Sequence, residues 1–152
     1  MTRWQLVIKH VIGSKPVLPL SLVTLVARAA IVTVFASSAS AHLADWNTTL
    51  FLFEDEYHLP LLPPAVAALL GVGVELVGSA LLAIGLWTRL AAFALLMVVT
   101  VIQLLVYPAA WPEHLQWATP LVLVVSLGGG RISLDALLER RLATIWSARP
   151  NP

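Results

Sequence analysis

The stretch PAVAALLGVGVELVGSALLAIGLWTR, residues 64–89, reads as a membrane-spanning helix that ends in a tight connection. It has no basic group before Arg89, and at about 1.5 Å per residue it can cross a hydrocarbon core of about 30 Å. Its one acidic residue, Glu75, falls in the middle. A carboxyl group at that depth costs about 2.5–3.5 kcal/mol even on lenient insertion scales, so Glu75 is a candidate functional residue. The alternative is a structural role in holding helices together.

Small residues flank Glu75 along one helical stripe. Gly71, Gly78 and Gly85 share this stripe with Glu75 and Leu82, at spacings of 3 and 4. Glycines on a stripe let another helix approach closely. We therefore expect this face to pack against protein rather than lipid.

The composition is that of an integral membrane protein. Of the 152 residues, 59% are apolar and 11% are charged, whereas soluble domains are about 25% charged. The chain has no cysteine, which excludes dithiol redox chemistry and thiolate metal sites within it. We expect one all-α membrane domain over residues 1–152, with the lipid bilayer and other membrane subunits as partners and no nucleic acid.

Four apolar runs predict a four-transmembrane-helix bundle, with spans at about 17–41, 64–87, 89–107 and 113–129. With both termini on the inside, every basic residue except Arg28 lies on that side, as the positive-inside rule requires. Ala39-Ser40-Ala41 resembles a signal-peptide cleavage site, but Arg28 interrupts the apolar run before it. We therefore expect the first span to be retained and both termini to be cytoplasmic.

Three short helices are expected beside the spans. Apolar residues recur at helical spacing from Trp4 to Ile12, in the outer connection at 46–57, and in a tail at about 132–147. The two terminal segments carry charges on their other faces, which is typical of helices lying at the cytoplasmic interface.

Arg28 and Glu75 are expected to form a structural ion pair. Counting residues inward from opposite ends places both near mid-membrane. Two charges at like depth are more economically explained as a pair than as two separate buried charges.

A ligand-binding site is the alternative use of the polar residues inside the spans. Arg28, Glu75, Gln103, His114 and Trp117 could line a cavity that opens outward and holds a polar head group or relays protons, as a quinone site requires. Imidazole and carboxylate side chains also bind transition metals. The weak metal candidates His42, His58 and His114 show no diagnostic spacing, so we expect no metal site.

The order of these features resembles the DoxX family of small four-helix bacterial membrane proteins. The resemblance covers residues 17–138 and is carried by the following segments: Arg28, Asp45-Trp46, Phe53 to Tyr57, Pro60 to Pro64, Glu75 to Gly78, Gly85 to Arg89, Gln103, Tyr107-Pro108, Trp111-Pro112, His114 and Gly130 to Asp135. Members commonly carry a Ser-Gly-x-x-Lys sequence at the outer end of the first span. This chain has Ser37 to His42 there, so the role of that glycine and lysine does not carry over.

The resemblance implies a place in the bacterial inner membrane beside redox complexes, because the family name comes from subunits of quinol-oxidising and thiosulfate:quinone oxidoreductase assemblies. We therefore expect an accessory or structural subunit, not catalytic alone, in a redox-linked membrane assembly. The alternative is a quinone- or small-molecule-binding component of an oxidoreductase, with its site around Glu75 and His114. Co-purification with large partners would favour the first, and a lone chain with bound quinone the second.

Overall fold

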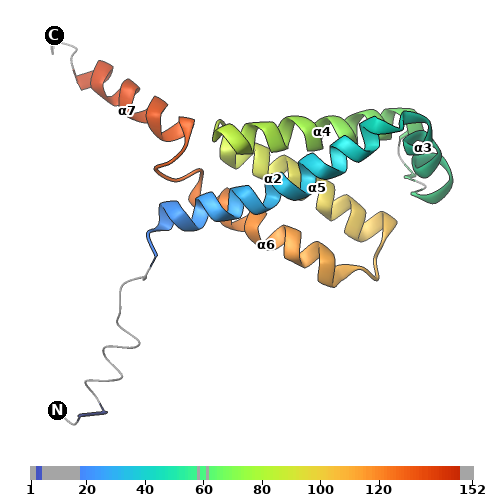
Figure 1. Ribbon diagram of the computed structural model, residues 1–152, viewed down its shortest axis with the longest axis horizontal. Helices are drawn as coiled ribbons and strands as arrows, with labels where there is room; N and C mark the ends of the chain where they lie inside the picture. Colours follow the sequence, from blue (N-terminus) through green and yellow to red (C-terminus); the bar gives the residue numbers. More distant parts are fainter. Residues whose placement is uncertain (1–2, 5–17, 58, 61, 148–152) are drawn as a thin grey trace.

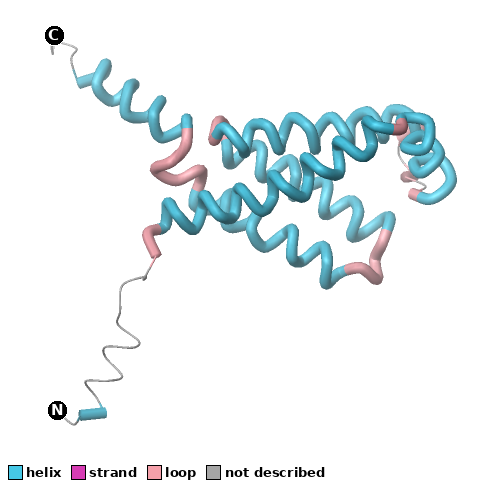
Figure 2. The backbone as a smooth tube through the Cα atoms, in the orientation of Figure 1, coloured by secondary structure: helices cyan, strands magenta, loops and turns pink. Residues whose placement is uncertain are grey.

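The computed structural model describes residues 3–4, 18–57, 59–60 and 62–147, and every regular element in these ranges is helical (Figures 1 and 2). The elements are α2 (Leu20–Ala44), α3 (Trp46–Phe51), the π-helical turn η1 (Leu52–Glu56), α4 (Pro64–Ile84), α5 (Thr88–Val101), the π-helical turn η2 (Ile102–Val106), α6 (Trp111–Leu127) and α7 (Leu134–Ser147).

Helices α2, α4, α5 and α6 pack into one bundle around an apolar core. Each helix contributes fully buried side chains to it, among them Ile31, Leu82, Leu95, Leu121 and Val124. Three described helices are long and apolar enough to cross a membrane, namely Leu20–Ala44, Pro64–Ile84 and Thr88–Val106. Helix α6 has 17 residues and packs as the fourth member of the bundle.

The short helices agree in part with the sequence pattern. The expected outer helix at 46–57 is present as α3 followed by η1, and the expected tail helix is α7, which leads away from the bundle (Figure 1). The expected helix from Trp4 to Ile12 lies, apart from its first residue, outside the described residues.

The connection between α4 and α5 forms what we call the hairpin end of the bundle, and α3 lies at the opposite, loop end (Figure 1). Helix α4 ends at Ile84, earlier than the predicted 87, because Gly85 adopts a left-handed conformation with φ of 76°. The non-glycine residue Trp87 also has a positive φ, of 47°. These two residues reverse the chain direction within a few positions.

The glycine stripe of α4 serves several neighbours rather than one facing helix. A Cβ atom on Gly78 would lie 2.9 Å from Leu95 Cγ of α5, and one on Gly71 would lie 3.5 Å from the Phe53 ring of η1. A Cβ atom on Gly85 would lie 2.7 Å from the Arg28 guanidinium. The stripe does pack against protein, as expected.

Asp135 fastens the segment after α6 to the hairpin. Its Oδ1 accepts from Trp87 N at 2.7 Å, and its Oδ2 accepts from Thr88 N and Thr88 Oγ1 at 2.9 and 2.8 Å. Partial burial raises the pKa of Asp135, but the hydrogen bonds from Thr88 and Trp87 and the charge of Arg28 outweigh it, and the pKa lies below its ordinary value. A carboxylate from a distant part of the chain therefore caps the start of α5.

Candidate functional site

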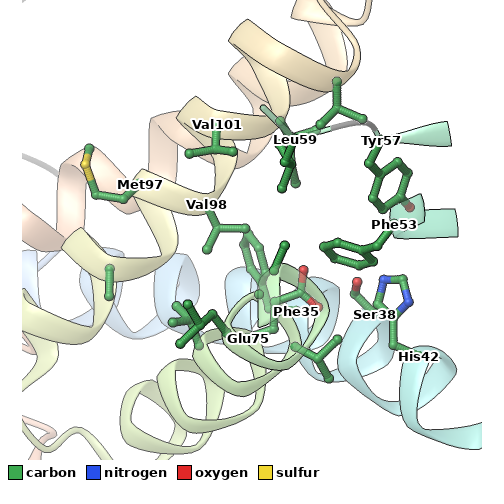
Figure 3. A pocket seen from close by; sticks show the side chains of 18 of the residues that line it. Phe35, Ser38, His42, Phe53, Tyr57, Leu59, Glu75, Met97, Val98 and Val101 are labelled. Atoms are coloured by element: carbon green, nitrogen blue, oxygen red, sulfur yellow. The ribbon is translucent and has the colours of Figure 1, made fainter. Parts of the chain in front are cut away.

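A cavity of about 690 Å³ lies inside the loop half of the bundle (Figure 3). Its wall is mostly apolar, and its volume falls within the range of about 300–1,000 Å³ typical of small-molecule sites. The side chains that matter below are Phe35, Ser38 and His42 of α2, Phe53 and Tyr57 around η1, Glu75 of α4, Met97 and Val101 of α5, and His114 and Trp117 of α6.

Glu75 is the one acidic residue among the described residues that line this cavity. Only 6% of it is exposed, and its Oε2 has no hydrogen-bond partner among the described residues. The Ser38 hydroxyl lies beside the carboxyl group (Figure 3). Buried polar atoms in native proteins nearly always have a partner, and leaving one without costs about 1–3 kcal/mol. Glu75 therefore offers an open hydrogen-bonding position to whatever fills the cavity.

The expected ion pair between Arg28 and Glu75 is wrong. Arg28 is buried, but its guanidinium donates to four backbone carbonyls at the hairpin end: Leu82 O at 2.8 Å, Ala83 O at 3.1 Å, Gly129 O at 3.1 Å and Ile132 O at 2.7 Å. Leu82 lies two helical turns from Glu75, about 10 Å along α4.

The physical reason is that helix ends hold carbonyl groups without intrahelical partners, and a long arginine side chain reaches them. Counting residues from the span ends places Cα atoms and ignores the direction in which a side chain extends. Arg28 therefore lies away from the cavity and holds the hairpin end together.

His114 lines the cavity with its ring held from behind by Gln103. Its Nδ1 lies 2.7 Å from Gln103 Oε1, and Gln103 Nε2 donates to Pro108 O at 2.8 Å. The rings of His114 and Trp117 lie 5.3 Å apart between centroids. Gln103 itself lines a second cavity of about 410 Å³, which His114 also lines. Of the five predicted binding residues, Glu75, His114 and Trp117 therefore meet at the main cavity, and Gln103 supports one of them.

Sequence reasoning missed the contribution of α2 to the cavity. Phe35, Ser38 and His42 share one face of that helix, at spacings of 3 and 4, a pattern the sequence does contain. His42 Nδ1 lies 3.2 Å from the Thr49 hydroxyl of α3. This region is also where the chain departs from the Ser-Gly-x-x-Lys pattern.

Of the weak metal candidates, His42 and His114 both line the cavity, and His58 lies outside the described residues. No group of three or more His, Cys, Asp or Glu side chains that could hold a metal ion occurs in the described ranges.

A clasp between η1 and the end of η2 closes the loop end of the cavity. The Tyr107 hydroxyl donates to Glu56 Oε1, and the rings of Tyr57 and Tyr107 lie edge to face at 5.9 Å. The hydrogen bond to Glu56, followed by partial burial, raises the pKa of Tyr107 to about 12. Burial, followed by the charge of Glu56, also raises the pKa of Tyr57. The aromatic rings around η1 are thus tied to the end of η2 by the hydrogen bond between Tyr107 and Glu56.

Comparison with known protein families gives a match over much of the chain. Residues 23–108 match the family model for DoxX. No curated protein and no solved structure matches the chain. The matched region runs from α2 through η2 and includes every cavity residue named above except His114 and Trp117.

Proposed function

The chain belongs to the DoxX family of membrane proteins, and from that premise we propose that it binds a lipid-soluble ring compound of the quinone class in the cavity lined by α2, η1, α4, α5 and α6. We propose further that it does so as an accessory component of a redox-linked assembly in the bacterial inner membrane. The resemblance to subunits of quinol-oxidising assemblies supports the second statement.

The observation that carries the binding proposal is the open carboxyl group of Glu75 inside an aromatic, mostly apolar cavity. Phe35, Phe53 and Trp117 supply ring surfaces, and Glu75, His42 and His114 supply polar atoms at separate points of the wall. Ligand sites typically combine apolar surface with a few polar groups that fix orientation. A buried carboxyl oxygen that has no described partner and lines a cavity supports a ligand-binding role over a purely structural one.

Entry from the bilayer is supported by the side chains between α4 and α5. Leu70, Met97 and Val101 line the cavity, yet they are 53%, 42% and 40% exposed on the outside of the bundle. All three are apolar, so the path between them suits a compound dissolved in lipid better than one dissolved in water. We propose that the ring lies in the cavity and that an isoprenoid tail leaves between these helices.

The topology proposal is that all four bundle helices cross the membrane as one domain with both termini cytoplasmic. Helix α6, at about 1.5 Å per residue, is slightly shorter than a typical hydrocarbon core. The positive-inside distribution of basic residues supports this arrangement.

Binding can be tested on the purified chain in lipid nanodiscs with decylubiquinone, followed through quenching of tryptophan fluorescence. We expect saturable binding that Glu75→Leu weakens about tenfold or more, because the site loses its open polar atom. Glu113→Leu is the matched control, since that acid is exposed at the start of α6. If neither decylubiquinone nor its reduced form binds saturably, the proposed function is wrong. It is also wrong if Glu75→Leu and Glu113→Leu weaken binding equally.

A further inference from the structure

The hydrogen-bond network behind the two cavity histidines determines which of their nitrogen atoms carries the proton. Gln103 Nε2 donates to Pro108 O, so the oxygen of this amide is the atom that faces His114 Nδ1 at 2.7 Å. An amide oxygen only accepts, so His114 Nδ1 must carry the hydrogen. In a neutral imidazole the other nitrogen, Nε2, is then an acceptor.

In His42 the proton also lies on Nδ1, and here the partner is the hydroxyl group of Thr49. The single hydroxyl proton of Thr49 serves a backbone carbonyl, either His42 O at 2.8 Å or Asp45 O at 3.1 Å. The contact of 3.2 Å between Thr49 Oγ1 and His42 Nδ1 is therefore donated by the ring. The Nε2 atom of His42 is again left as an acceptor, and no described hydrogen bond engages Nε2 of either histidine.

Glu75 adds a third acceptor. Its Oε2 is buried without a described partner, and a carboxyl group keeps acceptor capacity whether or not it holds a proton. The hydroxyls of Ser38 and Tyr57 also line the cavity, but a hydroxyl rotates to donate or accept, so they fit either kind of ligand. A protonated carboxyl group donates as well, so the groups that the surrounding structure fixes as acceptors are the Nε2 atoms of the two neutral histidine rings.

We propose that this site selects ligands that donate hydrogen bonds, specifically a ring bearing hydroxyl groups over the same ring bearing carbonyls. The inference rests on the proposed function and specifies its ligand further: of the two redox forms of a quinone-class compound, the hydroxylated one is preferred. A carbonyl oxygen facing His42 Nε2 or His114 Nε2 would place two acceptors against each other, and a buried acceptor left without a donor is costly.

The experiment compares matched ligands on the protein in nanodiscs. Decylubiquinol kept under argon should bind about tenfold tighter than decylubiquinone, and 4-octylphenol should bind tighter than 4-octylanisole, which has no hydroxyl proton and undergoes no redox change. Equal binding within both pairs, or preference for the carbonyl and ether forms, would overturn the inference while leaving the proposed function intact. If neither ubiquinone form binds, both fall.

The role of Gln103 as a positioning residue for His114 can be tested with a substitution of its own. Gln103→Leu removes the acceptor that holds the proton on His114 Nδ1, so the preference for decylubiquinol should fall several-fold. The ring ¹⁵N shifts of His114 should show the proton moving from Nδ1 toward Nε2, which a merely structural role would not produce. Gln116→Leu, at an exposed position of α6, is the control. Unchanged ¹⁵N shifts in Gln103→Leu would contradict the assignment of the tautomer.

Discussion

At the residue scale, Arg28 shows how a buried charge can be satisfied without an opposite charge. Its guanidinium serves the last carbonyls of α4 and two carbonyls of the segment after α6, which brings three parts of the chain to one point. A cation at a helix C-terminus is also favoured by the helix dipole. The planar fork with its five donors suits four acceptors in a way that the ammonium group of lysine does not.

We predict that Arg28→Leu lowers the free energy of unfolding by at least about 3 kcal/mol, because several buried carbonyls lose a charged donor at once. Arg28→Lys should recover part of this loss. Thermal unfolding in detergent micelles, followed by circular dichroism, measures both. Arg131→Leu is the control, an exposed arginine in the same segment.

The separation of Arg28 from Glu75 also predicts that substitutions at the two positions act independently on stability. Because the Arg28 guanidinium contacts the C-terminal end of α4 about two helical turns from Glu75, the losses caused by Arg28→Leu and Glu75→Leu should add within about 0.5 kcal/mol. Mutual rescue in the double variant would show that the two charges interact after all, and would contradict the structure described here.

The positions of the cavity-lining residues could be predicted from the sequence, whereas the contacts of Arg28 could not. The spacing of Phe35, Ser38 and His42 on one face, and the depth of Glu75, are periodic features that a helix preserves. The hydrogen-bond partners of Arg28 depend on which carbonyl groups, distant in sequence, lie within reach of its long flexible side chain. Such long-range contacts leave no periodic signal, and the pairing inferred from depth therefore failed.

At the element scale, the α3–η1 segment is held over the cavity by the clasp between Tyr107 and Glu56. Tyr107 lies just beyond the apolar stretch Thr88–Val106. Its pKa in the folded chain is about 12, compared with about 10 for an unperturbed tyrosine. The folded state thus holds this proton more tightly than the unfolded state. The stabilisation is fully present below pH of about 10 and is lost as the pH rises toward 12.

We predict that Tyr107, followed by tyrosinate absorbance in a Tyr57→Phe background, titrates near pH 12 and that Glu56→Gln moves its titration toward 10. The chain has two tyrosines, so this background isolates one signal. Glu54→Gln, at an exposed position of the same turn, should leave the titration unchanged. Amide hydrogen exchange in α3 and η1 should quicken in Glu56→Gln. If Glu54→Gln has the same effects, the clasp does not hold the segment.

At the scale of the whole molecule, periodicity predicted the helices well and the cavity poorly. The long apolar runs and the 46–57 pattern correspond to observed helices because each is a local property of the sequence. The observed helix ends differ from the predicted span ends by a few residues where the backbone leaves the helical conformation, as at Gly85. The cavity arises from the way four helices and the α3–η1 segment enclose space, and no single segment encodes that.

The number of membrane crossings can be argued from the two ends of α6. Near its start, His114 contacts Gln103 beyond the end of α5, at the loop end of the bundle. Just after its last residue, Gly129 and Ile132 accept from Arg28, and Asp135 binds Thr88, all at the hairpin end. Although α6 has only 17 residues, it therefore extends from the loop end to the hairpin end of the bundle. This favours a fourth membrane crossing. It also puts the start of α7 at the hairpin end.

This leads to a labelling prediction that the absence of native cysteines makes simple. In intact cells, a membrane-impermeant maleimide should label Asn47→Cys, in α3, but should label Ala143→Cys, in α7, only after the membrane is permeabilised. Both positions are exposed in the folded chain, so burial does not confound the comparison. Three crossings would place α3 and α7 on the same side, and equal labelling of the two cysteines in intact cells would therefore reject the four-span topology.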